Sequence, residues 1–358
     1  MDFTPTEAQS DLAQLVGEVC AKLVTADRLR ELDRDGRFDD QLWKALAETG
    51  VLAAALPESL SGNGFGVLEQ AAILRELGRV VAAVPYLWSS VLGAGALAEF
   101  GTAEQRELAE QAGTGDAIVT VALAPEQEVI AVADCDGGWA ITGRTNSVPY
   151  LDRAARVLVV AKTSDGPRVF VVDPSVESVR SEAQQVVDFT PEFLVDFDAT
   201  PAQLLGDASD AVASWLAERA WLGLAATQLG VLERAMDLTA EHTRTREQFG
   251  KAIGAFQSVA QRLSDAYIDV QGLRLAVTQA AWRLSEGLPA TESVHIAKFW
   301  AAEAGHRVAH TAIHLHGGIG IDRDHIAHNY FTAAKHHEFA LGGATCHLLA
   351  LGAELAKD

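Results

Sequence analysis

The chain has 358 residues, 49% of them hydrophobic, and a formal net charge of −21. This length suffices for about two or three packed units with a large core. The strong negative charge argues against nucleic acid or an anionic membrane as a partner. No uncharged run reaches the length of a membrane span.

The N-terminal residues and the cysteines bear on the cellular compartment. Residues 1–5 lack the basic and apolar regions of a signal peptide. Cys20, Cys135 and Cys346 are odd in number, lie far apart and show no metal-ligand spacing. We therefore expect a cytoplasmic protein with reduced, structural thiols.

Residues 1–115 carry helical patterns separated by turn residues. Thr4-Pro5-Thr6-Glu7 has the sequence of a capping box with proline at the first helical position, which predicts a helix start. The expected helices cover residues 8–24, 40–48, 67–80 and 88–98.

The periodicity changes after residue 115. Short runs rich in valine and isoleucine predict a small β domain over residues 116–205. From residue 206 to the end the pattern is helical again. The order of helices, sheet and helices predicts an α+β protein that is mainly α, with domains at 1–115, 116–205 and 206–358.

A polar hinge, defined here as Arg244 to Gln257, separates two long helical patterns. Residues 216–242 predict one helix, and apolar residues from Phe256 onward recur every three or four positions as one buried face of another. An arginine beside a helix N-terminus favours an anion such as a diphosphate, because the guanidinium, the amide donors and the helix dipole act together. On the residues alone, a helix–loop–helix corner with solvated arginines is an equal alternative.

Two motifs in this region point to a family. The hinge contains Arg-Thr-Arg-Glu-Gln-Phe-Gly-Lys-Ala-Ile-Gly-Ala-Phe-Gln, and His314-Leu315-His316-Gly317-Gly318-Ile319-Gly320 follows later. Both resemble motifs of the acyl-CoA dehydrogenase family, in the family's order, within a resemblance that covers nearly the whole chain. It is most similar to the small subunits of heteromeric acyl-CoA dehydrogenases that degrade steroid side chains in bacteria. The resemblance implies an N-terminal helical domain, a middle β-barrel-like domain, and a C-terminal four-helix bundle that forms the core of an oligomer.

The family resemblance also implies a reaction and a cofactor. In this family a glutamate removes the α-proton of an acyl-CoA thioester while FAD accepts a hydride from the β-carbon, which yields a trans-2-enoyl-CoA. In the family's tetramers the flavin ring lies in one subunit, and the neighbouring subunit holds the adenosine end. The motifs imply that this chain keeps the residues for the adenosine end. They are Arg246 for the pyrophosphate, Gln248, Phe249, Ile253, Phe256 and Gln257 along the cofactor, and His314, Leu315, Gly317 and Gly318 in the second segment.

Two of these assignments carry qualifications. His314 replaces the family's usual glutamine, and an imidazole can still donate and accept a hydrogen bond. Ile253 and Phe256 have core packing as their alternative role.

The residues for a flavin ring of its own are altered in this chain. The family's first β-domain motif corresponds to Leu123-Ala124-Pro125-Glu126-Gln127-Glu128, which lacks the family's Gly-Ser-Asp. In the second motif Ser147 replaces the family's tryptophan and Pro149 its threonine. Losing an aromatic stack and hydrogen-bonding groups at one site predicts that the ring is not held here.

The catalytic base is also missing from its usual places. Counting without gaps puts Ala220 and Leu341 at the family's two base positions. Glu218 is a weak candidate, because two residues along a helix turn the side chain by about 200°. Loss of a general base costs roughly 10²–10⁴ in rate, so we expect this chain alone not to be a competent dehydrogenase.

Four histidines have a spacing that metal ligands also use. His306, His310, His314 and His316 lie in an alanine-rich helical pattern, and the family uses no metal. We interpret them as interface or core residues and expect no metal.

These observations predict a division of labour between two subunits. The chain is expected to complete the FAD site of a related catalytic subunit in trans, in an α2β2 heterotetramer acting on a steroid, cholesterol-type, side-chain CoA thioester. An electron-transferring flavoprotein would accept the electrons by family analogy. Two alternatives stay open: a self-sufficient homotetrameric acyl-CoA dehydrogenase with Glu218 as base, and a flavin-free scaffold of the same fold.

Overall fold

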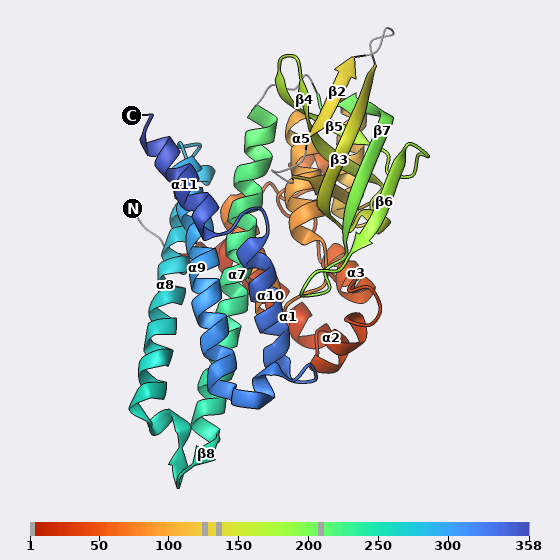
Figure 1. Ribbon diagram of the computed structural model, residues 1–358. Coiled ribbons are helices and arrows are strands. Elements are labelled where there is room, and N and C mark those ends of the chain that lie inside the picture. The colour runs from red at the N-terminus through yellow and green to blue at the C-terminus, as the bar shows by residue number, and fades with distance from the viewer. Residues whose placement is uncertain (1–3, 124–127, 134–137, 207–210, 358) are drawn as a thin grey trace. The chain divides into compact units, whose positions relative to one another are not determined.

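The computed structural model describes residues 4–123, 128–133, 138–206 and 211–357. Helices come first, strands β1 to β7 follow, and helices resume from Ala211, as the sequence predicted (Figure 1). The chain divides into two compact units. One comprises Met1–Glu31, Val67–Ala82 and Trp221–Asp358, and the other Leu32–Gly66 and Ala83–Ala220. The boundaries between the three domains predicted from the sequence stay a prediction.

The first helix starts later than the sequence suggested. The N-cap is Thr6, whose hydroxyl accepts a hydrogen bond from the Gln9 amide at 3.2 Å, while the Gln9 side chain accepts one from the Thr6 amide at 3.2 Å. The prediction of a cap at Thr4 with Pro5 at the first helical position is wrong. The Thr6–Gln9 pair satisfies both orphan donors, and it places Glu7 in the first turn, where the helix dipole favours a carboxylate.

Three of the helices before the sheet match expected ones with small shifts, whereas the helices at Ala26–Leu32 and Ala103–Thr114 were not predicted from the sequence. Within the described residues the α-helices before the sheet are α1 (Glu7–Leu23), α2 (Ala26–Leu32), α3 (Asp40–Glu48), α4 (Val67–Arg79), α5 (Gly95–Phe100) and α6 (Ala103–Thr114). The helix expected over residues 88–98 is instead a π-helical segment, Tyr86–Ala94, followed by α5. Its side chains are nearly all buried, so tertiary packing determines its winding.

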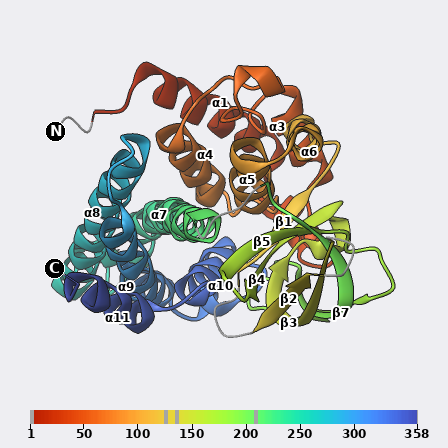
Figure 2. The same ribbon diagram turned by 90° about the horizontal axis from the view of Figure 1, so that it is seen from above.

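The middle of the chain forms one mostly antiparallel sheet. Within the described residues the strands are β1 (Val119–Ala122), β2 (Val129–Ala133), β3 (Trp139–Pro149), β4 (Arg156–Thr163), β5 (Gly166–Val172), β6 (Val179–Gln184) and β7 (Glu192–Leu204). Their order is β1-β4-β2-β3-β7-β5, with β6 paired to β7. Because β5 pairs with both β7 and β4, the sheet curls around a core of valine, isoleucine and phenylalanine side chains such as Ile141 and Phe170 (Figure 2).

The remaining helices pack beside one another as a bundle (Figures 1 and 2). They are α7 (Ala211–Thr245), α8 (Gln257–Ser285), α9 (Thr291–His316), α10 (Ile326–Phe339) and α11 (Ala344–Leu355). α9 packs against α8, α10 and α11. Glycines let α4 and α7 approach closely: a Cβ on Gly230 would lie 1.9 Å from the Arg75 carbonyl oxygen, and one on Gly78 would lie 2.1 Å from that of Thr227.

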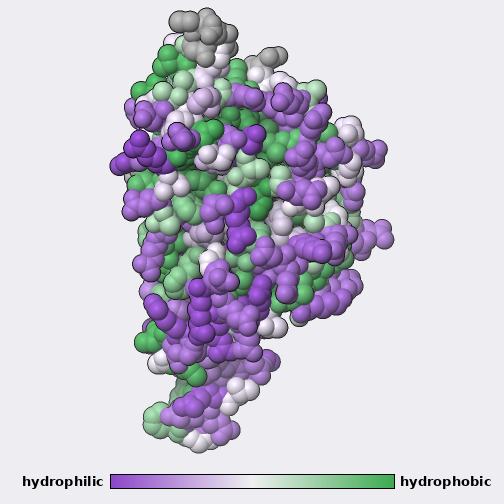
Figure 3. Space-filling model, turned by 90° about the vertical axis from the view of Figure 1, so that its right-hand side faces the viewer, coloured by the Kyte–Doolittle hydropathy of each residue, from purple (hydrophilic) through white to green (hydrophobic). Residues whose placement is uncertain are grey.

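The surface mixes polar and apolar side chains. On the face drawn in Figure 3, hydrophilic and hydrophobic residues are interspersed, as on most proteins. None of the described helices combines the length and the apolar character needed to cross a membrane.

Candidate functional site

The hinge between α7 and α8 folds as a short β-hairpin. Strand β8 (Glu247–Gln248) pairs with β9 (Lys251–Ala252), and the two residues between them, Phe249 and Gly250, have φ of 53° and 77°. Two central residues at positive φ are typical of a type I′ hairpin turn. Phe249 is 93% exposed, and its ring contacts only the edge-on ring of Phe256 among the aromatic pairs of the described chain, at 6.2 Å. A large aromatic residue at positive φ and almost fully in solvent is typical of a surface that another molecule covers.

The other predicted residues of the hinge surround this hairpin. Arg246 is exposed, and its backbone is fixed, since its amide donates to the His242 carbonyl at 2.9 Å and its carbonyl accepts from Ile253 at 2.8 Å. Gln248 and Gln257 are exposed, whereas Ile253 and Phe256 are half-buried.

The N-terminus of α8 has no side-chain cap. Its N-cap position is Phe256, which makes no side-chain capping hydrogen bond. Helix-terminal amides without a side-chain cap are available to an anion, and the dipole of a helix as long as α8 favours one there. An exposed arginine, open amides and a flat aromatic ring suit the adenosine diphosphate part of FAD in chemical type.

The second predicted segment is a glycine turn at the end of α9, defined here as Gly317 and Gly318. Gly317 has φ of 68° and ψ of −147°, a conformation that is essentially limited to glycine. A Cβ on either glycine would meet nothing within 4 Å, so backbone is presented to open space. His314 is exposed beside this turn, whereas Leu315 is buried.

The structure brings the hinge and the glycine turn to the same end of the bundle (Figure 1). The His242 ring, in the last turn of α7, stacks on the His316 ring, which precedes Gly317, with ring centroids 4.4 Å apart. The residues predicted to hold the adenosine end therefore form two adjacent segments.

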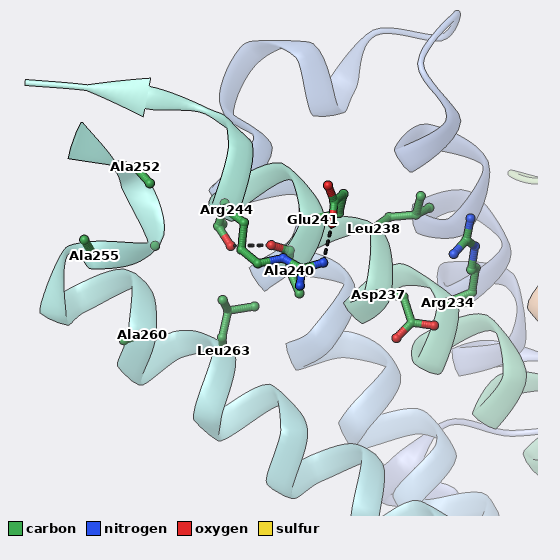
Figure 4. A pocket seen from close by; sticks show the side chains of 12 residues that line it. Arg234, Asp237, Leu238, Ala240, Glu241, Arg244, Ala252, Ala255, Ala260 and Leu263 are labelled. Carbon is green, nitrogen blue, oxygen red and sulfur yellow. Dashed lines mark hydrogen bonds and ion pairs between the residues drawn. The ribbon is translucent and has the colours of Figure 1, made fainter. Parts of the chain in front are cut away.

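A groove of about 900 Å³ lies beside the hinge without including the predicted cofactor residues. Figure 4 shows its two walls: α7 contributes charged side chains such as Arg234 and Glu241, and the hinge with α8 contributes small apolar ones such as Ala255 and Leu263. Arg244, which points along this groove, pairs with Glu241. Arg244 is thus engaged within its own helix, and Arg246 is the arginine left on the hairpin side.

Ala220 and Leu341, which the resemblance puts at the family's two base positions, lie on α7 and in the loop after α10. Ala220 is fully buried on α7, and Glu218, one residue before Arg219, is half-buried. Burial lowers the pKa of Arg219 to about 10, partly offset by the carboxylates of Glu218 and Glu99.

Leu341, at the second base position, belongs to a loop held by buried side chains. Its φ is 54°, which is unusual for a non-glycine residue. Its carbonyl oxygen lies 3.2 Å from the Trp221 indole nitrogen and 3.2 Å from His347 Nε2. Because a carbonyl only accepts, His347 carries its proton on Nε2, and its Nδ1 accepts from His295 Nδ1 at 2.9 Å. Burial, with Lys298 and His295 nearby, lowers the pKa of His347 to about 4, so the His347 ring is neutral near pH 7.

Lys298 secures the same loop from α9. It is fully buried, and its ammonium donates to the carbonyls of His337 at 3.1 Å, Glu338 at 3.4 Å and Gly342 at 2.8 Å. Burial lowers the pKa of Lys298 to about 7. The sequence analysis did not single out Lys298 or Trp221. The signal was a lone lysine among buried alanines and valines of α9.

The second altered flavin-ring motif lies on β3, and its role stays a prediction. Ser147 lies in a bulge with φ of 50°, and its amide donates to the Gln184 side chain at 2.8 Å. Arg144 pairs through two hydrogen bonds, at 2.5 and 2.8 Å, with Asp196 on β7. Of the first motif only Leu123 and Glu128 are described, and residues 124–127 lie outside the described residues.

No group of three or more His, Cys, Asp or Glu side chains with metal-binding geometry occurs in the described part of the chain. His306 instead lies 3.2 Å from the Glu338 carboxylate, and His310 packs edge-on against Phe331. His314 and His316 both belong to the last turn of α9.

Comparisons with known proteins show which proteins this chain is similar to. The model of the acyl-CoA dehydrogenase N-terminal domain matches residues 6–109, and that of the C-terminal domain matches residues 211–356. The chain is 48% identical to acyl-CoA dehydrogenase FadE27 of Mycobacterium tuberculosis, over 100% of this chain and 99% of that protein. It is similar to a chain of the ChsE4-ChsE5 complex from Mycobacterium tuberculosis, with a TM-score of 0.96, 49% identity and 100% of both chains covered. A chain in a variant of the Tcur3481-Tcur3483 steroid ACAD gives a TM-score of 0.93 at 37% identity, over 98% of each chain.

Proposed function

This chain belongs to the acyl-CoA dehydrogenase family, and from that premise we propose that it is a subunit of a heteromeric enzyme that completes a partner's FAD site without supplying the base. The fold, the oxidoreductase class and FAD as the family's cofactor, all predicted from the sequence, are confirmed. The finer assignment depends on the contrast between the two halves of the flavin site.

One observation carries the proposal. The hairpin presents Phe249, 93% exposed, and Arg246 outward, and the glycine turn beside it presents open backbone. Both base positions, in contrast, carry aliphatic residues, Ala220 and Leu341. A chain that keeps only the outward-facing half serves a neighbouring subunit.

Partner and substrate follow from similarity. The chain is similar to members of two complexes whose names each contain two different proteins, ChsE4-ChsE5 and Tcur3481-Tcur3483, and the second is described as a steroid ACAD. We therefore assign the chain to a heterotetramer of two copies of each subunit that forms a trans-2-enoyl-CoA from a steroid side-chain CoA thioester. Its partner is a related subunit with the glutamate base and the flavin-ring motifs, and an electron-transferring flavoprotein accepts the electrons.

In this assignment the chain binds and orients, and it transfers no proton. FAD bound at the shared site accepts the hydride of the reaction. Arg246 would neutralise the diphosphate, the α8 amides would donate hydrogen bonds, the glycine turn would let backbone approach the adenosine end closely, and Phe249 would cover the flat part of the cofactor. His314, Gln248 and Gln257 are placed to supply further polar contacts, while Ile253, Phe256 and Leu315 support them from within the fold.

The test is the flavin content of the complex formed with the partner subunit. Arg246→Met should weaken FAD retention about tenfold to a hundredfold, because a charge-assisted hydrogen bond contributes roughly 1.5–3 kcal/mol. Arg244→Met removes the same charge two residues away and should leave retention unchanged, since Arg244 pairs with Glu241. Equal losses in the two variants would mean that only net charge matters.

The same preparation decides among the alternatives. Subunit mass and flavin content should give two FADs per heterotetramer, and the lone chain should hold none. A lone homotetramer with one FAD per chain, reduced by an acyl-CoA and inactivated by Glu218→Gln, would replace the proposal with the self-sufficient enzyme. A complex that contains no flavin would instead support the flavin-free scaffold.

A further inference from the structure

Two imidazole rings join the two segments of the proposed flavin surface. His242 lies in the last turn of α7, just before the hinge, and His316 is the last residue of α9, just before Gly317. Their ring centroids are 4.4 Å apart and their planes are inclined by only 23°, so the rings stack. His316 is 8% exposed and His242 is half-buried, so the stack is only partly exposed to solvent.

The hydrogen bonds fix where a second proton would go. His316 Nδ1 lies 2.8 Å from the Ala312 carbonyl oxygen, and because a carbonyl only accepts, this nitrogen carries the proton of the neutral ring. A third imidazole, His325, lies edge-on to His316 at 5.4 Å, and its Nδ1 accepts from the Ala327 amide at 3.2 Å. Further protonation of His316 would therefore occur at Nε2.

The surroundings disfavour charge on this stack. Burial lowers the pKa of His242, and His316, His325 and Arg246 lower it further. Burial likewise lowers the pKa of His316, with His325 acting in the same direction and the Ala312 carbonyl acting against them. Both rings lie at helix C-termini, where the dipole favours a cation, but the downward shifts mean that burial and the neighbouring cations outweigh it.

We propose that the stacked rings of His242 and His316 position the hinge and the glycine turn relative to each other, and so hold the FAD-binding surface in one arrangement. The inference rests on the proposed function. Neither ring is assigned a contact with the cofactor. They are positioning residues that act through Arg246 on one side and Gly317 on the other.

The stability of the stacked arrangement should depend on pH. The pKa values of both rings lie below the ordinary histidine value of about 6.5, so the stacked arrangement binds fewer protons than the separated one, and its stability is fully present above about pH 6.5. As the pH falls below that value, protonation favours separated rings, because a cation in the stack meets the neighbouring imidazoles and Arg246. FAD retention should weaken in the same range.

The experiment compares the assembled complex containing wild-type chain with one containing His242→Phe. Phenylalanine keeps a flat ring over His316 but cannot be protonated. FAD dissociation constants are measured for both complexes at pH 7.5 and 5.5. Both complexes contain the same partner subunit, so dividing the wild-type constant by the variant constant removes the effect of the partner's own titration. The ratio of the wild-type to the variant dissociation constant should be near one at pH 7.5 and should rise by pH 5.5, within the limit of about tenfold per pH unit for each proton.

Two further variants separate positioning from other effects. His242→Ala removes the ring and should weaken FAD retention at both pH values. His310→Phe makes the same exchange at an exposed histidine of α9 and should keep the ratio at one. A flat ratio for His242→Phe overturns the inference, and so does a falling ratio, because tighter retention in acid means that an imidazolium binds the diphosphate directly.

These outcomes are distinct from failure of the proposed function. If the complex holds no FAD at pH 7.5, or if Arg246→Met leaves retention unchanged, the proposed function fails first. If Arg246→Met weakens retention and the His242→Phe ratio stays flat, only the positioning role fails.

Discussion

At the scale of single residues, the loop that carries the predicted second base position is held in place by buried side chains. Carbonyls at the end of α10 and in the loop after it accept from Lys298, Trp221 and His347, which come from α9, α7 and α11. Leu341 keeps a positive φ in this loop, a strain of about 1–3 kcal/mol that surrounding contacts must hold. These side chains therefore fix the loop around Leu341.

Lys298→Met tests this role. Methionine fills a similar volume but leaves three carbonyls without their donor, at about 1–3 kcal/mol for an unsatisfied group. Removing a buried charge offsets part of this cost. We expect the free energy of unfolding to fall by about 1–3 kcal/mol in denaturant titrations. Lys44→Met, at a side chain that is 78% exposed, should change it by less than about 0.5 kcal/mol. Unchanged or higher stability in Lys298→Met would show that the ammonium is dispensable.

At the scale of elements, the crossing of α4 and α7 depends on glycine. Gly230 and Gly78 face the carbonyls of Arg75 and Thr227 on the opposite helix, so each helix lies against the other's backbone. α7 also carries the hinge and His242 at its end, so this contact positions the helix that presents the hairpin.

Gly230→Ala should therefore destabilise the protein. Its Cβ would lie 1.9 Å from backbone, and backbone cannot move aside as a side chain can. Overpacking costs up to about 3 kcal/mol, against a gain of about 1 kcal/mol in helix propensity. We expect a loss of about 2 kcal/mol in thermal or denaturant unfolding. The matched exchange Gly272→Ala on α8, whose Cβ would lie 3.5 Å from the Trp300 ring, should be neutral or stabilising. Equal effects would refute the close crossing.

At the scale of the whole molecule, charge and exposed apolar residues point to assembly. A net charge of −21 repels anionic ligands at long range, so a diphosphate needs local donors such as Arg246. Ile268 and Leu275, two turns apart on α8, are 64% and 62% exposed. The chain is also similar to subunits of two complexes. We therefore expect the related subunit of the proposed complex to cover this face of α8.

Leu275→Ser should weaken the heteromeric complex without unfolding the chain. Burying a leucine contributes about 1.5–3 kcal/mol, so we expect the dissociation constant for the partner to rise about tenfold to a hundredfold. Analytical ultracentrifugation of mixed subunits measures it. Val132→Ser, at a 64% exposed position of β2, is the control and should leave assembly unchanged. Equal dissociation constants for the two variants would show that the partner does not bind this face of α8.

The sequence by itself determined the order of helices and strands, the hinge between two long helices and the family's motifs, because these depend on local periodicity and turn chemistry. Phe249-Gly250 forms its turn from neighbouring residues, and the motifs are contiguous. Even local chemistry had competing solutions, as the cap at Thr6 instead of Thr4 illustrates.

Only the tertiary structure decided which distant groups meet. The stacking of His242 on His316, the three carbonyls held by Lys298 and the glycine crossing of α4 and α7 join residues from different helices. Helical periodicity predicts that a face is buried, but not which partner it meets or at what angle. These contacts therefore follow from the packing of helices, which no single segment specifies.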